Sequence, residues 1–507
     1  MIPGSDIVDL SRLQFALTAL YHFLFVPLTL GLSVLLGIME TVYVMTGRQI
    51  WRDMVKYWGV LFGINFVLGV ATGLTMEFQF GTNWAYYSHY VGDVFGAPLA
   101  IEGLMAFFLE ATFVGLFFFG WDRLTKLQHL TTTWLLAIAT NLSALWILIA
   151  NGWMQNPVGA VFNFQTMRME VSSFYDILFN PVAQAKFVHT ISAGYVTGAI
   201  FVLAISAYFL LRGRNKEFAK RSMTVAVSFG LASALSVVVL GDESGYVANS
   251  NQKMKIAGME AVWHTEQAPA SLAVFGIPNE KTMKLDYAVE VPYVLGVIAT
   301  RSFNQPVEGI NELVEQGKEK IRDGILGYDA LTRLQKNPND AQAKADFFLH
   351  GENLGYSLLL KKYTESVVDA TDEQINQAAN DLRPHVKPLF FSFRIMVGCG
   401  LFFIFLFAVG FYLSVRRKLH TTRWYLHLAF WALPLPWVAA ELGWIVAEYG
   451  RQPWAVQGIL PTSLVTSSLG AGQLLTSLTS FFVFYTVLAI IEIYLMVKYI
   501  RLGPDNH

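Results

Sequence analysis

Nine long apolar runs constrain this chain more than any other feature of its sequence. An α-helix needs about 20 consecutive apolar residues to cross the roughly 30 Å hydrocarbon core of a bilayer. Runs of that length lie at 13–45, 58–82, 97–121, 131–152, 185–211, 221–241, 389–415, 424–447 and 471–498. The runs are continuous and do not alternate with polar residues, which argues against a transmembrane β-barrel. The sequence therefore predicts an all-α, polytopic membrane protein with nine transmembrane helices.

The composition excludes several other classes of protein. Hydrophobic residues make up 54% of the chain and charged residues only 14%, whereas soluble domains carry about 25% charged residues. The net charge of −1 provides no basic excess, so we expect no nucleic-acid partner. Cys399 is the only cysteine, which excludes an internal disulfide, a cysteine-based metal site and a C-x-x-C-H motif.

Charged residues are concentrated in one part of the chain. Residues 242–388 contain 15 Lys or Arg and 21 Asp or Glu, while the rest of the chain contains 21 and 16. The share of charged residues in 242–388 is that of a soluble domain, which predicts one large aqueous loop between the sixth and seventh helices. The predicted organisation is therefore 1–241 with helices one to six, 242–388 as the loop, and 389–507 with helices seven to nine.

Lysine and arginine are distributed unequally between the two sides of the membrane. The short loops after the first, third, fifth and seventh predicted helices, together with the C-terminal segment, carry 16 of them. The opposite short loops carry four. Because such residues accumulate on the cytoplasmic side, we predict a periplasmic N-terminus, a periplasmic 242–388 loop and a cytoplasmic C-terminus.

Ionisable side chains inside the predicted helices are the main functional signal. On insertion scales a charged residue costs about 2.5–3.5 kcal/mol at the centre of a helix, so each is a functional hypothesis by default. The predicted sidedness brings several of them, with Met396 and Arg451, to one level near the outer surface. The set is His22, Glu40, Glu77, Glu102, Glu110, His189, Arg394, Glu441, Glu448 and Glu492.

The residues alone leave three interpretations open. Histidine and methionine are ligands of haem iron, and arginine pairs with haem propionates. The same buried carboxylates would also serve a proton-coupled transporter or channel without haem. A third possibility is a quinone-linked electron-transfer subunit that carries haem but has no oxygen chemistry.

Six motifs then lie in order along the chain. They are SRLQFALTALYH at 11–22, GLTMEFQFGTNW at 73–84, GWDR at 120–123, NGWMQ at 151–155, GDESG at 241–245 and GRQPW at 450–454. Together they resemble subunit I of the cytochrome bd quinol oxidases over essentially the whole chain. The resemblance implies a quinol:oxygen oxidoreductase that oxidises quinol at the periplasmic side and reduces oxygen to water.

The resemblance also implies two haems b and one haem d near the outer surface. His189 and Met396 match the axial ligands of the low-spin haem b, and such a pair suits electron transfer. His22 matches the axial ligand of haem d, with Glu102 close to the opposite face. The same ligands would hold either haem d or a haem b at this terminal site.

Four further residues are expected around the haems on the same resemblance. Glu448 matches the carboxylate at the high-spin haem b. Arg394 and Arg451 are expected to pair with propionates. Trp444, four residues before Glu448, is expected to lie on the same helical face and pack against a macrocycle.

The long loop resembles the quinol-binding loop of the family. In it Lys255 and Glu260 match residues implicated in quinol oxidation, which releases two protons and therefore needs proton acceptors. The two positions are five apart, so on a helix they would diverge. Without the resemblance they would be interpreted as a solvated charge pair.

Protons for oxygen reduction need a path from the cytoplasm. The resemblance assigns Glu102 and Glu110 as relays, Ser143 near mid-membrane and Asp122 at the inner end of the third helix. Glu40 and Glu492, near the inner ends of the first and last helices, either extend this path or bond neighbouring helices. The second interpretation is the one we favour.

The predicted enzyme moves charge without pumping, because protons are released outside and consumed from inside, and so generates a proton motive force. The resemblance implies a bacterial inner-membrane location, a homologous second subunit and a small single-span subunit. The identity of the quinone, ubiquinol or menaquinol, stays open.

Overall fold

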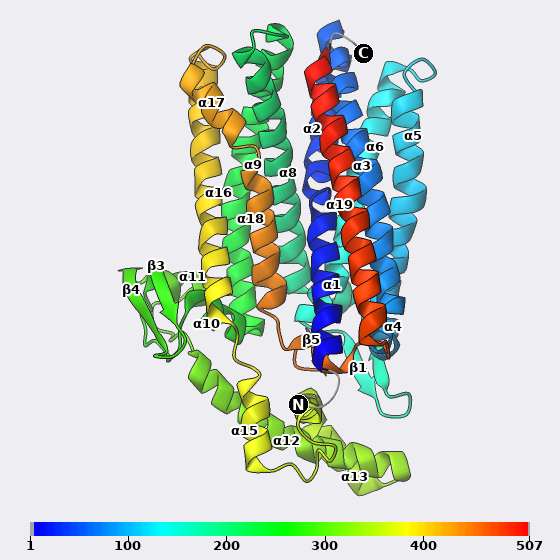
Figure 1. Cartoon of the computed structure of the whole chain (residues 1–507), viewed down its shortest axis with the longest axis vertical. Helices are drawn as coiled ribbons and strands as arrows, with labels where there is room; N and C mark the ends of the chain where they lie inside the picture. The colour runs from blue at the N-terminus through cyan, green and yellow to red at the C-terminus, as the bar shows by residue number, and fades with distance from the viewer. Residues whose placement is uncertain (1–4, 505–507) are drawn as a thin grey trace.

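The computed structural model describes residues 5–504 as one helical bundle with an extramembrane insertion at one end (Figure 1). Within these residues nine helical segments are long and apolar enough to cross a membrane, which confirms the predicted polytopic all-α fold. The first helix begins at the end that carries the insertion, and the last helix ends at the opposite end (Figure 1). The two ends of the chain are therefore separated by the length of the bundle, as an odd number of crossings requires.

The nine segments are built from the following helices. The first four are α1 (Ser5–Phe23) with α2 (Val26–Thr46), α3 (Gln49–Thr82), α4 (Ala85–Leu104) with the π-helix η1 (Met105–Glu110) and α5 (Ala111–Phe119), and α6 (Lys126–Gln155). The next two are α7 (Phe174–Leu178) with α8 (Pro181–Leu211), and α9 (Lys216–Asn251). The last three are α16 (Val386–Val415), α17 (Arg423–Trp431) with α18 (Leu435–Trp444) and the π-helix η4 (Ile445–Tyr449), and α19 (Ala471–Leu502).

The first crossing is interrupted between α1 and α2, where the sequence predicted one uninterrupted run. Pro27 lies in the first turn of α2 and has no N–H to continue the ladder. The carbonyl of Phe25 accepts a hydrogen bond from Asn65 Nδ2 at 2.7 Å, and that of Leu24 accepts one from Trp437 Nε1 at 2.7 Å. A side chain of a neighbouring helix thus satisfies the Leu24 carbonyl, as a bilayer requires, while the Phe25 carbonyl also accepts from the Thr29 N–H at 3.2 Å.

The insertion is a mixed structure on the end of the bundle. Its helices are α10 (Lys253–Glu260), α11 (Val294–Thr300), α12 (Ile310–Lys336), α13 (Ala341–His350), α14 (Leu354–Leu358) and α15 (Asp372–Asn380), with 3₁₀ turns η2 (Gly351–Asn353) and η3 (Leu359–Lys362). Strands β3 (Leu272–Asn279) and β4 (Lys284–Val291) form an antiparallel hairpin. Helix α9 continues through the predicted boundary at 241/242 and ends at Asn251.

Two other short hairpins lie in the loops at this end of the bundle. Strand β1 (Ala160–Asn163) pairs with β2 (Arg168–Val171), and β5 (Trp454–Val456) pairs with β6 (Leu460–Pro461). A 3₁₀ turn, η5 (Thr462–Leu464), follows directly. The second hairpin places the segment after η4 next to α10, because residues of both line the same cavity.

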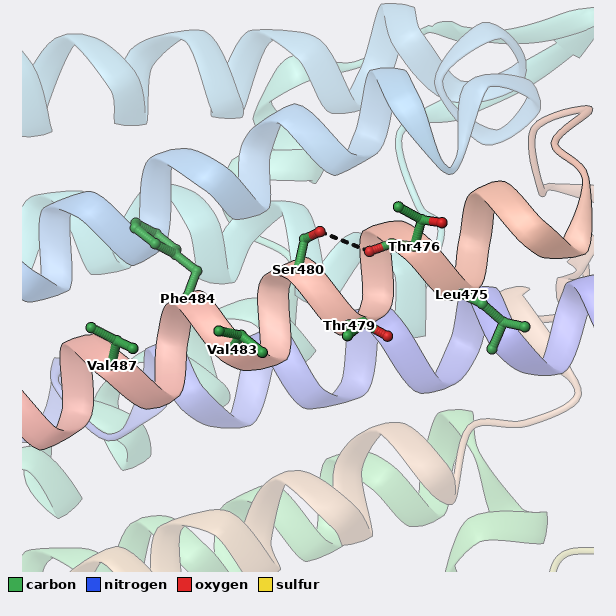
Figure 2. Close-up of a pocket in the computed structure, with 7 residues that line it drawn as sticks. All are labelled: Leu475, Thr476, Thr479, Ser480, Val483, Phe484 and Val487. Atoms are coloured by element: carbon green, nitrogen blue, oxygen red, sulfur yellow. Dashed lines mark hydrogen bonds between the residues drawn. The ribbon is translucent and has the colours of Figure 1, made fainter.

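A shallow groove runs along the outer face of α19 (Figure 2). All of its lining side chains come from this one helix, and they are apolar or carry hydroxyl groups: Leu475, Thr476, Thr479, Ser480, Val483, Phe484 and Val487. The Ser480 hydroxyl donates to the Thr476 carbonyl at 2.8 Å. A hydroxyl bonded within its own helix leaves no unpaired donor, so this face is compatible with hydrocarbon.

Helices α2 and α8 approach each other closely at small residues, as is typical of membrane helix pairs. A Cβ at Gly31 would lie 2.3 Å from the Gly194 carbonyl oxygen and 2.7 Å from Gly198 Cα. Gly31→Ala is therefore expected to destabilise the protein by about 1–3 kcal/mol, because the helices must separate. The measurement is the thermal unfolding midpoint in detergent, with Gly92→Ala as the control because a Cβ at Gly92 has nothing within 4 Å. Equal midpoints for the two variants would contradict this packing.

Candidate functional site

The two predicted ligands of the low-spin haem lie in one group of four helices. Helix α8 packs on α9, α9 on α16, α16 on α18, and α18 on α8. A Cβ at Gly241 of α9 would lie 3.4 Å from His189 Nε2, and a Cβ at Gly443 of α18 would lie 3.1 Å from Met396 Sδ. Each predicted ligand atom thus faces a glycine of a neighbouring helix.

His22, the predicted ligand of the terminal haem, is oriented by Thr72 of α3. The His22 Nδ1 atom lies 2.9 Å from Thr72 Oγ1. The hydroxyl of Thr72 also donates to the Leu68 carbonyl at 2.9 Å, so it accepts from Nδ1–H of His22. This hydrogen bond fixes the tautomer and leaves Nε2 with a free lone pair, which is the arrangement of a metal-ligating histidine.

His22 also faces a glycine, since a Cβ at Gly73 would lie 3.0 Å from its Cε1 atom. Glycine lets a backbone approach a bound group closely. All three predicted nitrogen and sulfur ligands share this environment, although they belong to different helices. The residues present therefore fit haem groups bound between helices.

Glu448 is held by hydrogen bonds from several directions. It lies in the π-helix η4, and its oxygens accept from Asn151 Nδ2 (3.0 Å), Gln155 Nε2 (2.9 Å), Lys186 Nζ (3.5 Å) and Arg451 Nη2 (2.6 Å). Oε1 takes three of these bonds and Oε2 takes one. An oxygen with two lone pairs and one donor keeps capacity for a further partner, so Oε2 is available to a metal.

Lys186 contacts both Trp444 and Glu448. The Lys186 Nζ atom lies 5.2 Å from the centroid of the Trp444 ring and contacts Glu448 at 3.5 Å. Helix α18 ends at Trp444 and the π-helix begins at Ile445, so the spacing between Trp444 and Glu448 is not that of a regular α-helix. The edge of the Phe23 ring packs on Trp444 with centroids 5.1 Å apart.

Among the buried polar groups without a hydrogen-bond partner in the part of the chain that the structure describes, two lie within seven residues of Glu448 in the sequence. One is the Nε atom of Arg451, and the other is the carboxyl of Glu441, both of whose oxygens are buried. Unpaired buried polar groups are rare in native proteins and need an explanation. A free donor on Arg451 fits its predicted role as the partner of a haem propionate. The sequence assigned no role to Glu441.

Arg394 differs from Arg451, because all five of its N–H groups are engaged. Its Nε atom donates to the Ala273 carbonyl at 3.0 Å, and its Nη2 atom donates to the same carbonyl at 2.5 Å. The Nη2 atom also donates to Glu260 Oε2 at 2.9 Å. Its Nη1 donates to the carbonyls of Met259 (2.9 Å) and Phe390 (3.3 Å). Arg394 thus ties α16 to α10 and β3, and Glu260 is its ion-pair partner.

Lys255 lines a cavity between the insertion and the bundle. The cavity has a volume of about 240 Å³ and is also lined by Gln252, Tyr356, Arg451 and Trp454. The Nζ atom of Lys255 donates to Gln155 Oε1 at 2.5 Å and to Gln252 Oε1 at 2.8 Å.

The environment of Lys255 favours its uncharged form. The residue is only 6% exposed, and burial lowers the pKa of its amine well below the usual range, with Lys186 and Arg451 acting in the same direction. Burial also raises the pKa of the Glu260 carboxyl, against the opposing charge of Arg394. The two residues diverge along α10 as predicted, since Glu260 pairs with Arg394 while Lys255 faces Gln155 and the cavity.

Ser143 of α6 and Glu102 of α4, both predicted to belong to the proton path, contact each other. The Ser143 hydroxyl donates to Glu102 Oε1 at 2.9 Å. A side-chain hydrogen bond also joins Glu102 to Glu77 of α3, which the sequence analysis noted only as an ionisable residue in a helix. These three side chains form one polar cluster from three helices.

Glu110 and Asp122 lie further along the same crossing. Glu110 is 5% exposed and is the last residue of the π-helix η1, so the segment between Glu102 and Glu110 is not uniformly α-helical. The Asp122 side chain is 95% exposed and lies 3.8 Å from Arg52. Asp122 lies in the turn after α5, and α5 lies toward the end of the bundle opposite to the insertion (Figure 1).

Glu40 bonds a neighbouring helix, which is the interpretation favoured from the sequence. Its Oε1 atom lies 2.6 Å from His129 Nδ1, and its Oε2 atom accepts from Thr133 at 2.5 Å, both residues of α6. The other ring nitrogen of His129 lies 3.0 Å from the Phe117 carbonyl. This buried contact joins α2, α5 and α6.

Comparisons with known proteins decide between the open interpretations. The family model of cytochrome bd terminal oxidase subunit I matches residues 10–504. The chain belongs to this family. It is therefore a subunit of a terminal quinol oxidase, an enzyme that transfers electrons from quinol to oxygen, and not a haem-free transporter or a subunit without oxygen chemistry.

Individual relatives agree with the family assignment. The chain is 52% identical over 500 residues to cytochrome bd-II ubiquinol oxidase subunit 1 of Escherichia coli, covering 99% of this chain and 97% of the relative. It is 37% identical to cytochrome bd ubiquinol oxidase subunit 1 of Bacillus subtilis, covering 98% and 95%. The fold is similar to that of bd oxidase from Geobacillus thermodenitrificans, with a TM-score of 0.79, 24% identity and coverage of 99% of this chain and 100% of that one.

The family and the nine apolar segments identify a multi-pass protein of the bacterial inner membrane. Subunit I of such an oxidase works with a second subunit, and the enzyme carries haem and acts on quinol.

Proposed function

We propose that this oxidase subunit oxidises quinol in the cavity beside Lys255 and holds three haems between its helices. The observation that carries the proposal is that His22, His189 and Met396 each lie against a glycine of a neighbouring helix. When bound, two haems b and one haem d would carry electrons from quinol to oxygen, in the order low-spin haem b, high-spin haem b, haem d.

The residues proposed to hold these groups are those that the resemblance implies, and their surroundings in the structure support them. His189 and Met396 would bind the low-spin haem b, His22 the terminal haem, and Glu448 the high-spin haem b through its Oε2 atom. Glu102 would lie near the terminal haem, opposite to His22. Trp444 and Arg451 would line the high-spin site, with the unpaired Nε of Arg451 donating to a propionate. Arg394 would position the loop through Glu260.

Lys255 would act as a proton acceptor for quinol. Its buried amine is held by two glutamine side-chain carbonyls, and burial lowers its pKa, which favours the uncharged form that a general base needs. Glu260 supports this site from the other side of α10 by fixing the helix to Arg394.

Protons consumed in oxygen reduction would arrive from the opposite end of the bundle. Asp122 is exposed there, Glu110 is buried further along the crossing, and Ser143 donates to Glu102. Combined with the distribution of Lys and Arg, this supports a periplasmic insertion and N-terminus and a cytoplasmic C-terminus. Charge separation of this kind stores about 2.3 kcal/mol per charge across 100 mV, so the enzyme generates a proton motive force without pumping.

Assembly follows from the same proposal. A homologous second subunit and a small single-span subunit would cover part of the apolar surface of the bundle. The substrate is ubiquinol or menaquinol, and two of the relatives are named for ubiquinol.

Haem extraction from the purified complex tests the proposal. The expected result is two protohaems and one chlorin-type haem per complex, identified by mass, with a spectral shift when carbon monoxide is added to the reduced protein. A complex that contains no iron pigment would contradict it. Three protohaems would contradict only the haem d assignment.

A further inference from the structure

Gln155 joins the proposed quinol site to the proposed ligand of the high-spin haem. It is the last residue of α6 and is only 2% exposed. Its Oε1 atom accepts from Lys255 Nζ at 2.5 Å, and its Nε2 atom donates to Glu448 Oε1 at 2.9 Å. One amide group therefore contacts both Lys255 and Glu448, which lie on different elements of the chain.

We propose that Gln155 is a positioning residue that sets the Lys255 amine toward quinol and the Glu448 carboxylate toward the high-spin haem iron at the same time. This inference rests on the proposed function, because it assumes the roles of Lys255 and Glu448. It adds a direct structural link between quinol binding and the environment of that haem.

The chemistry of the amide explains why glutamine suits this position. An amide oxygen only accepts hydrogen bonds and an amide NH₂ only donates them, whereas an amine donates and a carboxylate accepts. With the oxygen toward Lys255 and the nitrogen toward Glu448, both contacts are satisfied in one orientation. A reversed amide would place its oxygen against the Glu448 carboxylate, and both groups only accept, so the carboxylate selects one orientation.

Two neighbouring residues each make only one of the two contacts. Gln252 accepts from Lys255 Nζ at 2.8 Å through its Oε1 atom, and its Nε2 atom donates to Gln457 at 3.3 Å. Asn151 donates to Glu448 at 3.0 Å and accepts from Lys186. Gln252 thus contacts Lys255 but not Glu448, and Asn151 contacts Glu448 but not Lys255. Asn151 Oδ1 also accepts a long bond from Gln155 Nε2 at 3.5 Å, so Gln252 is the cleaner matched control for Gln155.

The experiment compares three substitutions of similar size in the purified complex: Gln155→Met, Gln252→Met and Asn151→Leu. Two readouts are used, the KM for quinol in oxygen consumption and the ferric absorption and midpoint potential of the high-spin haem b. Gln155→Met is expected to raise the quinol KM several-fold and also to shift the haem spectrum and potential. Gln252→Met is expected to change only the KM, and Asn151→Leu only the haem readout.

A further variant separates the two contacts of Gln155. Gln155→Glu keeps an acceptor for Lys255 but removes the donor to Glu448, so the haem readout is expected to shift more than the quinol KM. A purely structural role would lower the thermal unfolding midpoint of Gln155→Met and leave both readouts at their wild-type values.

The possible results distinguish the inference from the function on which it rests. If Gln252→Met and Asn151→Leu behave as expected but Gln155→Met changes one readout or neither, the link through Gln155 is overturned. If Asn151→Leu leaves the haem readout unchanged, the ligand role of Glu448 is wrong and the link is overturned with it. If Gln252→Met leaves the KM unchanged, the quinol role of Lys255 is wrong, with the same consequence.

Discussion

His22→Ala is expected to reduce oxygen consumption by the purified complex below detection, while the low-spin haem b stays reducible by quinol. Alanine removes the only imidazole that Thr72 orients at this site, so the terminal haem loses its protein ligand. His189 and Met396 lie on other helices, α8 and α16, and their haem should be retained. The measurements are oxygen uptake with quinol and an absorption spectrum after quinol is added under anaerobic conditions.

Two control variants make this prediction specific. Thr72→Val keeps the imidazole but removes the hydrogen bond at Nδ1. Loss of such a partner of a ligating histidine typically lowers metal affinity or activity by about 10–100-fold. His264→Ala removes a histidine of the insertion whose side chain is 70% exposed and should leave oxygen uptake unchanged. Wild-type turnover in His22→Ala would refute the assignment of this ligand.

Lys255→Met is expected to lower quinol oxidation by about 100-fold or more, because general-base catalysis contributes about 10²–10⁴-fold. Methionine fills the space of the lysine stem but offers no amine to accept a proton. The expected spectral result is full haem content with slow reduction by quinol and normal reduction by dithionite. Lys318→Met serves as the control, because the half-buried Lys318 pairs with Glu315 within α12 and is not among the residues that line the cavity.

The pH dependence of quinol oxidation provides an independent check on Lys255. A base that accepts a proton must be uncharged, so kcat/KM for quinol should rise with pH as the amine loses its proton. Because burial lowers the pKa of Lys255 well below its usual range, this rise should occur well below the usual pKa of lysine. Lys255→Met should remove this limb of the profile. If the rise of kcat/KM with pH is the same in the variant, the rise belongs to a group other than Lys255.

Hydropathy and charge alone predicted the membrane fold because each crossing must satisfy its own backbone in lipid. That requirement produces long, continuous apolar runs, and all nine runs correspond to helical crossings of the described chain. The interruption at Leu24 and Phe25 was not predicted, since its carbonyls are satisfied by Asn65 and Trp437 from distant positions. The π-helices at Glu110 and Glu448 and the β3–β4 hairpin left no periodic signal either.

The candidate site was predicted only in part, for a related reason. Charged residues and histidines are conspicuous in an apolar run, so His22, Glu102 and Glu448 stood out at once. Asn151 and Gln155 are neutral and occurred only inside a motif, although they donate to Glu448. Their importance depends on contacts between residues more than 290 positions apart, which no local pattern records.

The five hydrogen bonds of Arg394 have a mechanical consequence for the insertion. Four of them join α10 and β3 to a membrane helix, so this part of the insertion is held against the bundle. Residues 242–388 are therefore no autonomous module. A chimaera that grafts this insertion onto another oxidase would need the arginine of α16 transplanted along with it.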